Sequence, residues 1–189
     1  YTYALHSSPL TGLKNNYEQW QNDFFNSLNK NFRKLILYRK CIYAVTRFHD
    51  HQNQLIKFPE LIQDTRQSSF KKILSDSRIV IIDNRQTTYI ECLVLNHPVI
   101  LFWNQDDWEV RAEVEPYFNN LIDAGILFKS PIEAAKKLES VYEDPEKWWQ
   151  SEQVQSARNN FVTRFANTSK SWENEWIDVG EKVKQNLFD

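Results

Sequence analysis

Three short apolar runs, separated by residues with helical spacing, most constrain what this chain can fold into. The runs lie at 34–38, 78–82 and 98–102, with the sequences KLILY, RIVII and PVILF. Continuous apolar runs of this length are typical of strands that are covered on both faces, as in parallel sheets. Because parallel strands need crossover connections, the helical patterns between the runs predict right-handed βαβ units. The sequence therefore predicts an α/β fold with a doubly wound, Rossmann-like parallel sheet.

The other elements expected along the chain continue this alternation. Strands are also predicted at 1–5 and 126–128, helices at 17–28, 68–74, 89–95, 110–124, 130–142, 152–166 and 170–183, and mostly loop at 41–67. We predict a Rossmann-like domain over 1–145 and a helical C-terminal extension over 146–189. Because the sequence begins inside the first predicted strand, we expect it to be a fragment of a longer protein.

Glycine is scarce, and this excludes one large class of phosphate sites. The 189 residues include only three glycines, and neither a Walker loop nor a glycine-rich dinucleotide fingerprint is present. The net charge of -2 gives no long-range attraction to nucleic acid, and we expect no nucleic-acid partner. No apolar stretch reaches the roughly 20 residues that a membrane span needs, so we expect no membrane span.

The cysteines and two neighbouring histidines favour no metal site. Cys41 and Cys92 lie in apolar runs without CxxC spacing, which is typical of buried thiols in a reducing compartment. His49 and His51 have no cysteine or carboxylate cluster at ligand spacing beside them. We therefore expect a cytoplasmic protein, with peripheral contact at the inner membrane through the full-length protein left open.

Polar segments follow three of the predicted strands. In open α/β sheets, ligands bind beyond the carboxyl ends of the strands. These ends carry HSS at 6–8, RK at 39–40 and DNRQTT at 83–88. The third segment is the richest, because a helix N-terminus follows it at once and its free N–H groups favour phosphate. Two structural alternatives stay open: His6 can be a structural histidine and Arg39 a surface charge.

Thr87, Thr88 and Glu91 are the candidate ligand-binding residues of this helix start. The two hydroxyl groups can donate to an anion, and Glu91, one turn later, can accept hydrogen bonds from a ribose diol. Structural roles are also open here. Thr87 or Thr88 can cap the helix, Thr88 and Glu91 have the spacing of a capping box, and Asp83 can brace the turn between strand and helix.

The pattern within 75–138 resembles the donor domain of GT-B glycosyltransferases that act on lipopolysaccharide and capsule, and more closely the transferases of bacterial surface-carbohydrate biosynthesis. The matching residues are Asp83, Thr87, Thr88, Glu91, Asn96, Pro98, Leu121, Gly125 and Ile126. A Tyr-x-x-x-Gln pattern at Tyr17 and Gln21 also fits. Arg85 and Gln86 depart from the pattern, because they stand where such enzymes commonly have small residues.

The resemblance implies the C-terminal half of a two-domain GT-B enzyme, the half that holds the donor nucleotide. The nucleotide-binding residues that it implies are Ser8, Arg39, Asp83, Thr87, Thr88 and Glu91. In that interpretation the helix start takes the phosphate of a nucleotide sugar, Glu91 takes the ribose, and Arg39 balances phosphate charge. No catalytic residue is identified, and His6 and Arg39 are the candidates.

The resemblance also implies partners and a mode of catalysis. The expected partners are a nucleotide sugar, the N-terminal domain of the same protein, and a glycan or glycolipid acceptor. Helix dipoles and basic side chains can stabilise a departing phosphate, so we expect metal-independent catalysis without a cofactor. Because the base that deprotonates the acceptor would lie in the other half, we expect this chain to be inactive alone.

Other functions stay open on the sequence. A polyol-phosphate transferase or a nucleotide-sugar epimerase of GT-B fold would share the same nucleotide half. A non-catalytic, flavodoxin-like interaction module would need a large exposed apolar patch, for which the tryptophan-rich tail at 148–176 is the candidate. We expect Trp148 and Trp149, with Trp172 and Trp176 nearby, to pack among the terminal helices rather than to form a sugar platform. We also expect the tail to make the isolated chain self-associate.

Overall fold

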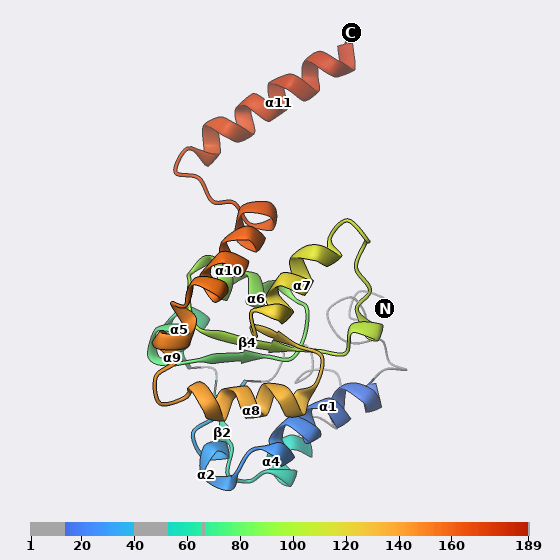
Figure 1. Ribbon diagram of the computed structural model, residues 1–189. Helices are drawn as coiled ribbons and strands as arrows, with labels where there is room; N and C mark the ends of the chain where they lie inside the picture. Colours follow the sequence, from blue (N-terminus) through green and yellow to red (C-terminus); the bar gives the residue numbers. More distant parts are fainter. Residues whose placement is uncertain (1–13, 40–52, 66, 189) are drawn as a thin grey trace, which may run out of the picture.

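The computed structural model describes residues 14–39, 53–65 and 67–188, and these residues form an α/β structure (Figure 1). The strands are β1 (Leu37–Tyr38), β2 (Ile62–Gln63), β3 (Val80–Ile82), β4 (Val99–Phe102) and β5 (Leu127–Phe128). The helices are α1 (Lys14–Ser27), α2 (Lys30–Arg33), α4 (Asn53–Lys57), α5 (Phe70–Asp76), α6 (Thr87–Val94), α7 (Glu115–Asp123), α8 (Pro131–Val141), α9 (Pro145–Trp149), α10 (Glu152–Phe165) and α11 (Trp172–Phe188), with a 3-10 helix, η4 (Gln105–Asp107). The strand predicted at 1–5 lies outside the described residues.

The strand pairs of the described residues are all parallel, as the apolar runs predicted. β1 pairs with β2, and β3, β4 and β5 form a second sheet in the order β3-β4-β5. The prediction of one doubly wound sheet is corrected here, because the described strands form two small parallel sheets. Helices nevertheless connect β3 to β4 and β4 to β5, as parallel pairing requires.

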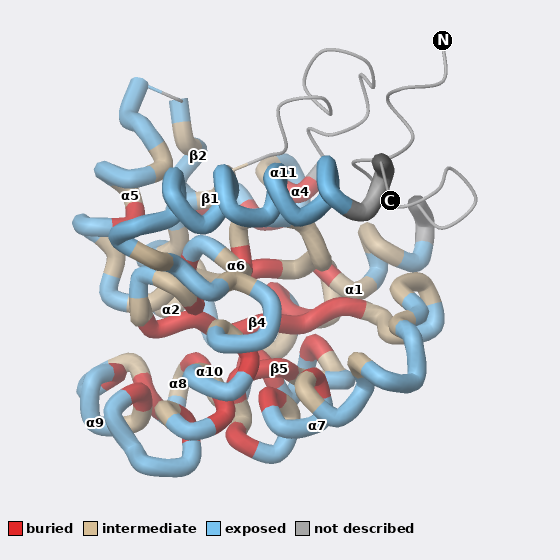
Figure 2. The backbone as a smooth tube through the Cα atoms, turned by 90° about the horizontal axis from the view of Figure 1, so that it is seen from above, coloured by how far each residue is buried: buried red, intermediate tan, exposed pale blue. Residues whose placement is uncertain are grey.

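β4 is the centre of the molecule, and its residues alternate between two cores. Val99 and Leu101 belong to a core that includes residues of α6, α7 and α10. Ile100 and Phe102 belong to a second core that includes residues of α1 and α8. None of these four residues is more than 2% exposed, and Figure 2 shows β4 in the colour of buried residues. The run at 98–102 is apolar throughout because helices cover both faces of its sheet.

The first apolar run, 34–38, is not a buried strand, and this prediction was wrong over most of its length. Asn29 caps α2 by accepting hydrogen bonds from two backbone N–H groups. The turn continues past the helix, since the N–H of Leu35 donates to the carbonyl of Phe32 at 2.9 Å. Leu35 is 56% exposed, and only the last two residues of the run pair as β1. Local capping therefore prevails over the apolar pattern.

Two further boundaries differ from the sequence predictions. The stretch 41–67 was predicted to be mostly loop, but its described part contains α4 and β2, with Phe58 and Leu61 buried between them. The helix predicted at 110–124 begins only at Glu115, with Pro116 in its first turn. Proline is tolerated in a first turn and not in a helix interior, which explains the later start.

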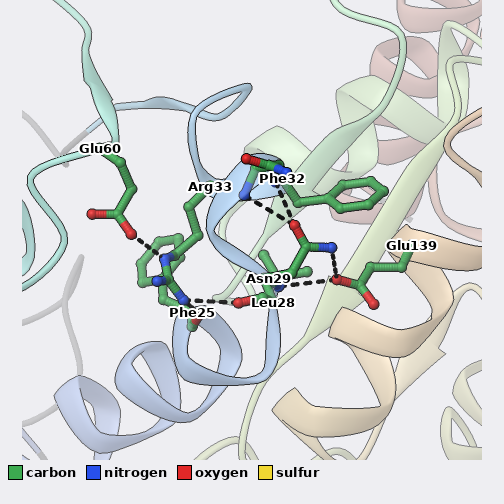
Figure 3. Close-up of polar contacts among 8 residues, drawn as sticks. Phe25, Leu28, Asn29, Phe32, Arg33, Glu60 and Glu139 are labelled. Atoms are coloured by element: carbon green, nitrogen blue, oxygen red, sulfur yellow. Dashed lines mark hydrogen bonds and ion pairs between the residues drawn. The ribbon is translucent and has the colours of Figure 1, made fainter.

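A polar joint fixes the end of α1 against its neighbours (Figure 3). The backbone N–H and the side-chain amide of Asn29 both donate to Glu139 of α8, each at 3.0 Å. Arg33 donates to the carbonyls of Phe25 and Leu28, at 2.9 and 2.8 Å, and forms an ion pair with Glu60. A cation at the end of a helix satisfies carbonyls that have no intrahelical partner. The joint orients α1, whose first half lies at the site described below.

The helices after residue 145 comprise a buried part and an exposed part. Trp149 of α9 and Phe161 of α10 are 0% and 1% exposed and belong to the core that includes α6 and α7. The packing role expected of Trp149 is confirmed, whereas Trp172 and Trp176 are 56% and 70% exposed and belong to neither described core. α11 extends away from the rest of the molecule in Figure 1, and its residues 172–185 are all exposed. The division of the chain after residue 145 stays a prediction.

Candidate functional site

A pocket opens where β3 and β4 end, and we call it the strand-end pocket. It is a small hollow, open to solvent, with a cavity volume of about 10 Å³. Its lining residues are Tyr17, Trp20 and Gln21 from α1, Asp83 after β3, and Phe102, Trp103, Asn104, Asp107 and Trp108 from the end of β4 and the following loop. The carboxyl ends of parallel strands are the expected place for a ligand in an α/β sheet.

Asp83 is the polar centre of this pocket. Gln21 donates to one carboxylate oxygen at 2.5 Å, and Asn84 donates to the other at 3.0 Å. Gln21 is itself positioned by Gln54, which donates to its side-chain oxygen at 3.2 Å. Gln21 and Gln54 are 7% and 4% exposed, so a buried amide chain holds Asp83 in one orientation. The predicted role of Asp83 as a brace for the turn and a role in binding are both compatible with this geometry.

Two tyrosine hydroxyl groups lie in the electrostatic field of Asp83. Burial raises the pKa of the Tyr17 hydroxyl well above its ordinary value, and the negative charge of Asp83 raises it further. Burial and then the charge of Asp83 also raise the pKa of Tyr38. Both hydroxyl groups therefore remain protonated at neutral pH. Tyr17 lines the pocket, so it offers a neutral hydroxyl beside a carboxylate.

The start of α6 provides an open helix N-terminus next to Asp83. The N-cap residue is Gln86, and it makes no side-chain capping hydrogen bond. Thr87 and Thr88 lie inside the first turn, so the prediction that either threonine caps the helix, and the capping box of Thr88 with Glu91, were wrong. An N-terminus without a side-chain cap leaves backbone N–H groups for water or an anion. Glu91 lies one turn later and is exposed.

Arg85 lies between Asp83 and the start of α6, and sequence reasoning assigned it no role. Its guanidinium group donates to the carbonyl of Trp108 at 3.3 Å. It also lies over the rings of Trp108 and Phe118, at 5.7 and 6.0 Å from their centroids. These contacts hold the positive charge of Arg85, which lies two residues before α6 begins in the sequence, against Trp108 of the pocket wall and Phe118 of α7. Arg85 is therefore a second source of positive potential beside the helix N-terminus.

The remaining predicted site residues do not meet at the pocket in the described residues. Arg39, after β1, pairs with Asp64, after β2, with 3.3 Å between the guanidinium nitrogen and the carboxylate oxygen. The side chains of Arg39 and Asp64 are 30% and 6% exposed, so part of the arginine charge is already balanced. His6 and Ser8 lie outside the described residues. The structure thus brings together only the predicted residues of the β3–α6 connection.

Most of the pocket wall was missed by sequence reasoning. Tyr17 and Gln21 matched the family pattern, but nothing in the sequence places α1 over the ends of β3 and β4. The loop after β4 was detectable, because 104–108 reads NQDDW directly after an apolar run, the same signal that selected Asp83. In that loop Asn104 accepts a hydrogen bond from the N–H of Asp106 at 3.2 Å, and Asn16 donates to Asp107 at 3.2 Å.

Comparison with protein families identifies the chain at the family level. The model of the LIC12162 family transferase matches residues 1–179. The chain belongs to the LIC12162 family of transferases. Searches of curated proteins and of solved structures found no match. Because the family is one of transferases, membership supports an enzymatic role for this LIC12162 family protein.

Three properties of the LIC12162 family chain bear on the other predictions. Within the described residues, no group of three histidine, cysteine or acidic side chains is placed to hold a metal ion, and no helix is long and apolar enough to cross a membrane. Cys92 is 0% exposed, and burial raises the pKa of its thiol to about 12, which makes it unreactive at neutral pH. Cys41, His49 and His51 lie outside the described residues. Metal independence of the reaction stays a prediction.

Proposed function

We propose that this LIC12162 family chain is the nucleotide-sugar-binding, C-terminal half of a GT-B glycosyltransferase in bacterial surface polysaccharide or lipopolysaccharide biosynthesis. The observation that carries the proposal is the β3–α6 connection. It presents Asp83 in a pocket, Arg85 beside it, and an α6 N-terminus without a side-chain cap. A positive helix end beside hydrogen-bonding side chains supports a ligand that carries both phosphate and hydroxyl groups.

Each group of the connection has a role in this proposal. The backbone N–H groups of α6, with the Thr87 and Thr88 hydroxyl groups, bind the phosphate of the nucleotide sugar. Arg85 adds positive charge from its position against Trp108. Glu91 accepts hydrogen bonds from the ribose diol. When the sugar is transferred, these groups stabilise the charge that develops on the departing phosphate, so the reaction needs no metal ion at this position.

The rest of the reaction belongs to the partners that the proposal names. The N-terminal domain of the same protein supplies the acceptor site and the base that deprotonates the acceptor hydroxyl. The acceptor is a glycan or a glycolipid. Arg39 forms an ion pair with Asp64, with 3.3 Å between the charged atoms. To bind the phosphate, Arg39 must leave this ion pair.

Calorimetric titration with CMP, CDP, UDP and GDP tests the proposal directly. We expect one nucleotide to bind, and Glu91→Ala to weaken that binding about tenfold, as expected for loss of hydrogen bonds to a charged acceptor. Glu152→Ala is the matched control, because Glu152 is an exposed glutamate at the start of α10, outside the site residues. If no nucleotide binds, or if Glu152→Ala weakens binding as much as Glu91→Ala, the proposed site is wrong.

A further inference from the structure

We propose that α11 packs in an antiparallel arrangement against α11 of a second copy of this chain. The surface concerned is the α11 stripe, which consists of Trp172, Trp176, Val179 and Val183. The pairing goes beyond the proposed function and does not rest on it, because the residues of the β3–α6 connection and of the strand-end pocket lie outside α11. It fixes both the orientation of the two helices and the charged groups that meet between them.

The α11 stripe has the spacing of a helix that packs along another helix. Its residues follow one another at intervals of four, three and four positions, which are the a and d positions of a heptad. All four residues are exposed, and residues of α11 are absent from both described cores. Figure 1 shows α11 extending away from the other elements. The stripe is therefore accessible to a helix of another molecule.

The order of side chains along the stripe favours an antiparallel partner. The two tryptophans come first and the two valines follow. When two copies run antiparallel, Trp172 faces Val183 of the second copy, and Trp176 faces Val179 of the second copy. Each layer then combines a large side chain with a small one, which is how facing positions of packed helices interdigitate. A parallel pair would place tryptophan opposite tryptophan and valine opposite valine, so its layers would differ in width.

Charged side chains beside the stripe favour the same orientation. Glu175 lies one position before Trp176, and Lys182 lies three positions after Val179, so both occupy g positions of the heptad. Because Trp176 and Val179 face each other in the antiparallel pair, Glu175 lies beside Lys182 of the second copy. The twofold symmetry of such a dimer forms this contact twice. A parallel pair would place Glu175 beside Gly180, which carries no charge.

Gly180 is a separate observation that agrees with this register. It lies in the interior of α11, where glycine lowers helix stability relative to alanine. A Cβ atom at this position would meet open space, so no contact among the described residues accounts for a glycine there. In the antiparallel pair, Gly180 flanks the layer of Trp176 and Val179. A residue without a side chain leaves room there for the indole ring of the second copy.

The charge of α11 is unfavourable for a lipid surface. The helix contains four acidic residues and two lysines, and its net charge is therefore negative. Helices that lie on membranes are typically rich in lysine and arginine, which are attracted to anionic headgroups. A second copy of α11 instead offers a lysine to each Glu175. The α11 stripe therefore fits a second copy of the chain better than it fits a membrane.

Sedimentation equilibrium of the whole chain and two charge variants tests the pairing and its orientation. We expect the unmodified chain to form dimers at concentrations up to about 1 mM. Lys182→Glu and Glu175→Lys should each weaken dimerisation about tenfold, because each creates two contacts between like charges. An equimolar mixture of the two variants should dimerise about as well as the unmodified chain, because a mixed pair has opposite charges at both contacts.

Two matched variants control for the change in net charge. Lys184→Glu and Glu181→Lys alter residues of the same helix that lie outside its a, d, e and g positions, and they should change dimerisation by less than about twofold. Circular dichroism verifies that α11 stays helical in each variant. This matters most for Glu175→Lys, because Ser169 and Ser171 donate to one carboxylate oxygen of Glu175 at 2.5 and 3.0 Å.

Each alternative outcome overturns the pairing. A helical chain that stays monomeric at about 1 mM would do so, and if that monomer sediments with vesicles of phosphatidylcholine and phosphatidylglycerol, the stripe binds lipid instead. A dimer that the mixture of variants does not restore would be parallel or formed elsewhere on the chain. Lys182→Glu should leave nucleotide binding unchanged, so failure of the dimer and failure of the nucleotide site are separate results.

Discussion

Asp83 shows how one carboxylate can set the ionisation of its neighbours. It accepts hydrogen bonds from Gln21 and Asn84, and its charge raises the pKa of both Tyr17 and Tyr38. The larger cause in each tyrosine is burial, which disfavours the phenolate. The folded protein therefore holds these two protons more tightly than the unfolded chain does.

This proton difference predicts a loss of stability at alkaline pH. An unfolded tyrosine loses its proton near pH 10, while Tyr17 in the folded state keeps its proton to higher pH. The stabilisation is complete below about pH 10 and is lost as the pH rises toward the folded pKa, at about 1.4 kcal/mol per pH unit for each proton. Tyr17→Phe should make the decline above pH 10 shallower, as measured by urea unfolding at pH 9 to 11.

Tyr142→Phe is the control for this experiment. Tyr142 lies against Arg78, whose guanidinium carbon is 4.9 Å from its ring centroid, and not against a carboxylate. Its removal should leave the alkaline slope nearly as it is in the unmodified chain. An unchanged slope in Tyr17→Phe would mean that Tyr17 is not the buried hydroxyl group seen beside Asp83.

Arg85 carries the second prediction at the residue scale. Arg85→Gln should weaken binding of the preferred nucleotide about tenfold, because hydrogen bonds from a charged donor to phosphate contribute about 1.5–3 kcal/mol. Arg111→Gln should have little effect, since Arg111 is exposed and lies outside the site. Calorimetry at two salt concentrations measures both. A weaker salt dependence in Arg85→Gln alone would confirm that its charge reaches the ligand.

At the scale of elements, helix caps show that residue type does not decide which caps are made. Asn29 caps α2 and also donates twice to Glu139 (Figure 3). Ser130 occupies the N-cap position of α8 but makes no side-chain capping hydrogen bond. Asn29→Ala should lower the free energy of unfolding by about 1 kcal/mol, and Ser130→Ala should change it by less than about 0.5 kcal/mol. Urea unfolding at neutral pH measures both, and equal effects would contradict the assigned caps.

Burial and local capping together explain which elements could be predicted from the sequence. β4 is buried on both faces and β3 is partly buried, and the apolar runs predicted both strands. The run at 34–38 carries a similar pattern, but the Asn29 cap and the following turn remove most of it from the sheet. Short-range hydrogen bonds of this kind leave little trace in hydrophobic periodicity.

The candidate site was predictable only where it is local in sequence. Asp83 and the start of α6 follow one another along the chain, so the rule for strand ends identified them. The bond between Gln21 and Asp83 joins residues 62 positions apart, and Gln54 reaches Gln21 across 33 positions. Such contacts depend on how α1 packs against α8, which no local pattern encodes. The part of the pocket wall that α1 supplies therefore became visible only in the folded structure.

At the scale of the whole molecule, α11 has an exposed apolar face, and none of the described residues buries it. Trp172, Trp176, Val179 and Val183 follow one another at helical spacing and are 56%, 70%, 49% and 52% exposed. Residues of α11 are absent from both described cores. None of the described residues covers this stripe, and an exposed apolar stripe favours association. In the proposed dimer, it meets the same stripe of a second copy.

We therefore predict that the isolated chain self-associates through α11 as its concentration rises. Burying apolar surface contributes about 25 cal/mol per Å², and tryptophan offers the largest area of any side chain. Trp172→Ser with Trp176→Ser should shift the chain to a monomer in sedimentation velocity runs across a concentration series. Leu95→Ser, at a residue that is 60% exposed outside α11, should leave association unchanged. A chain that stays monomeric at every concentration would show that five exposed apolar side chains on α11, the four of the stripe and Ile177, do not form a self-complementary surface.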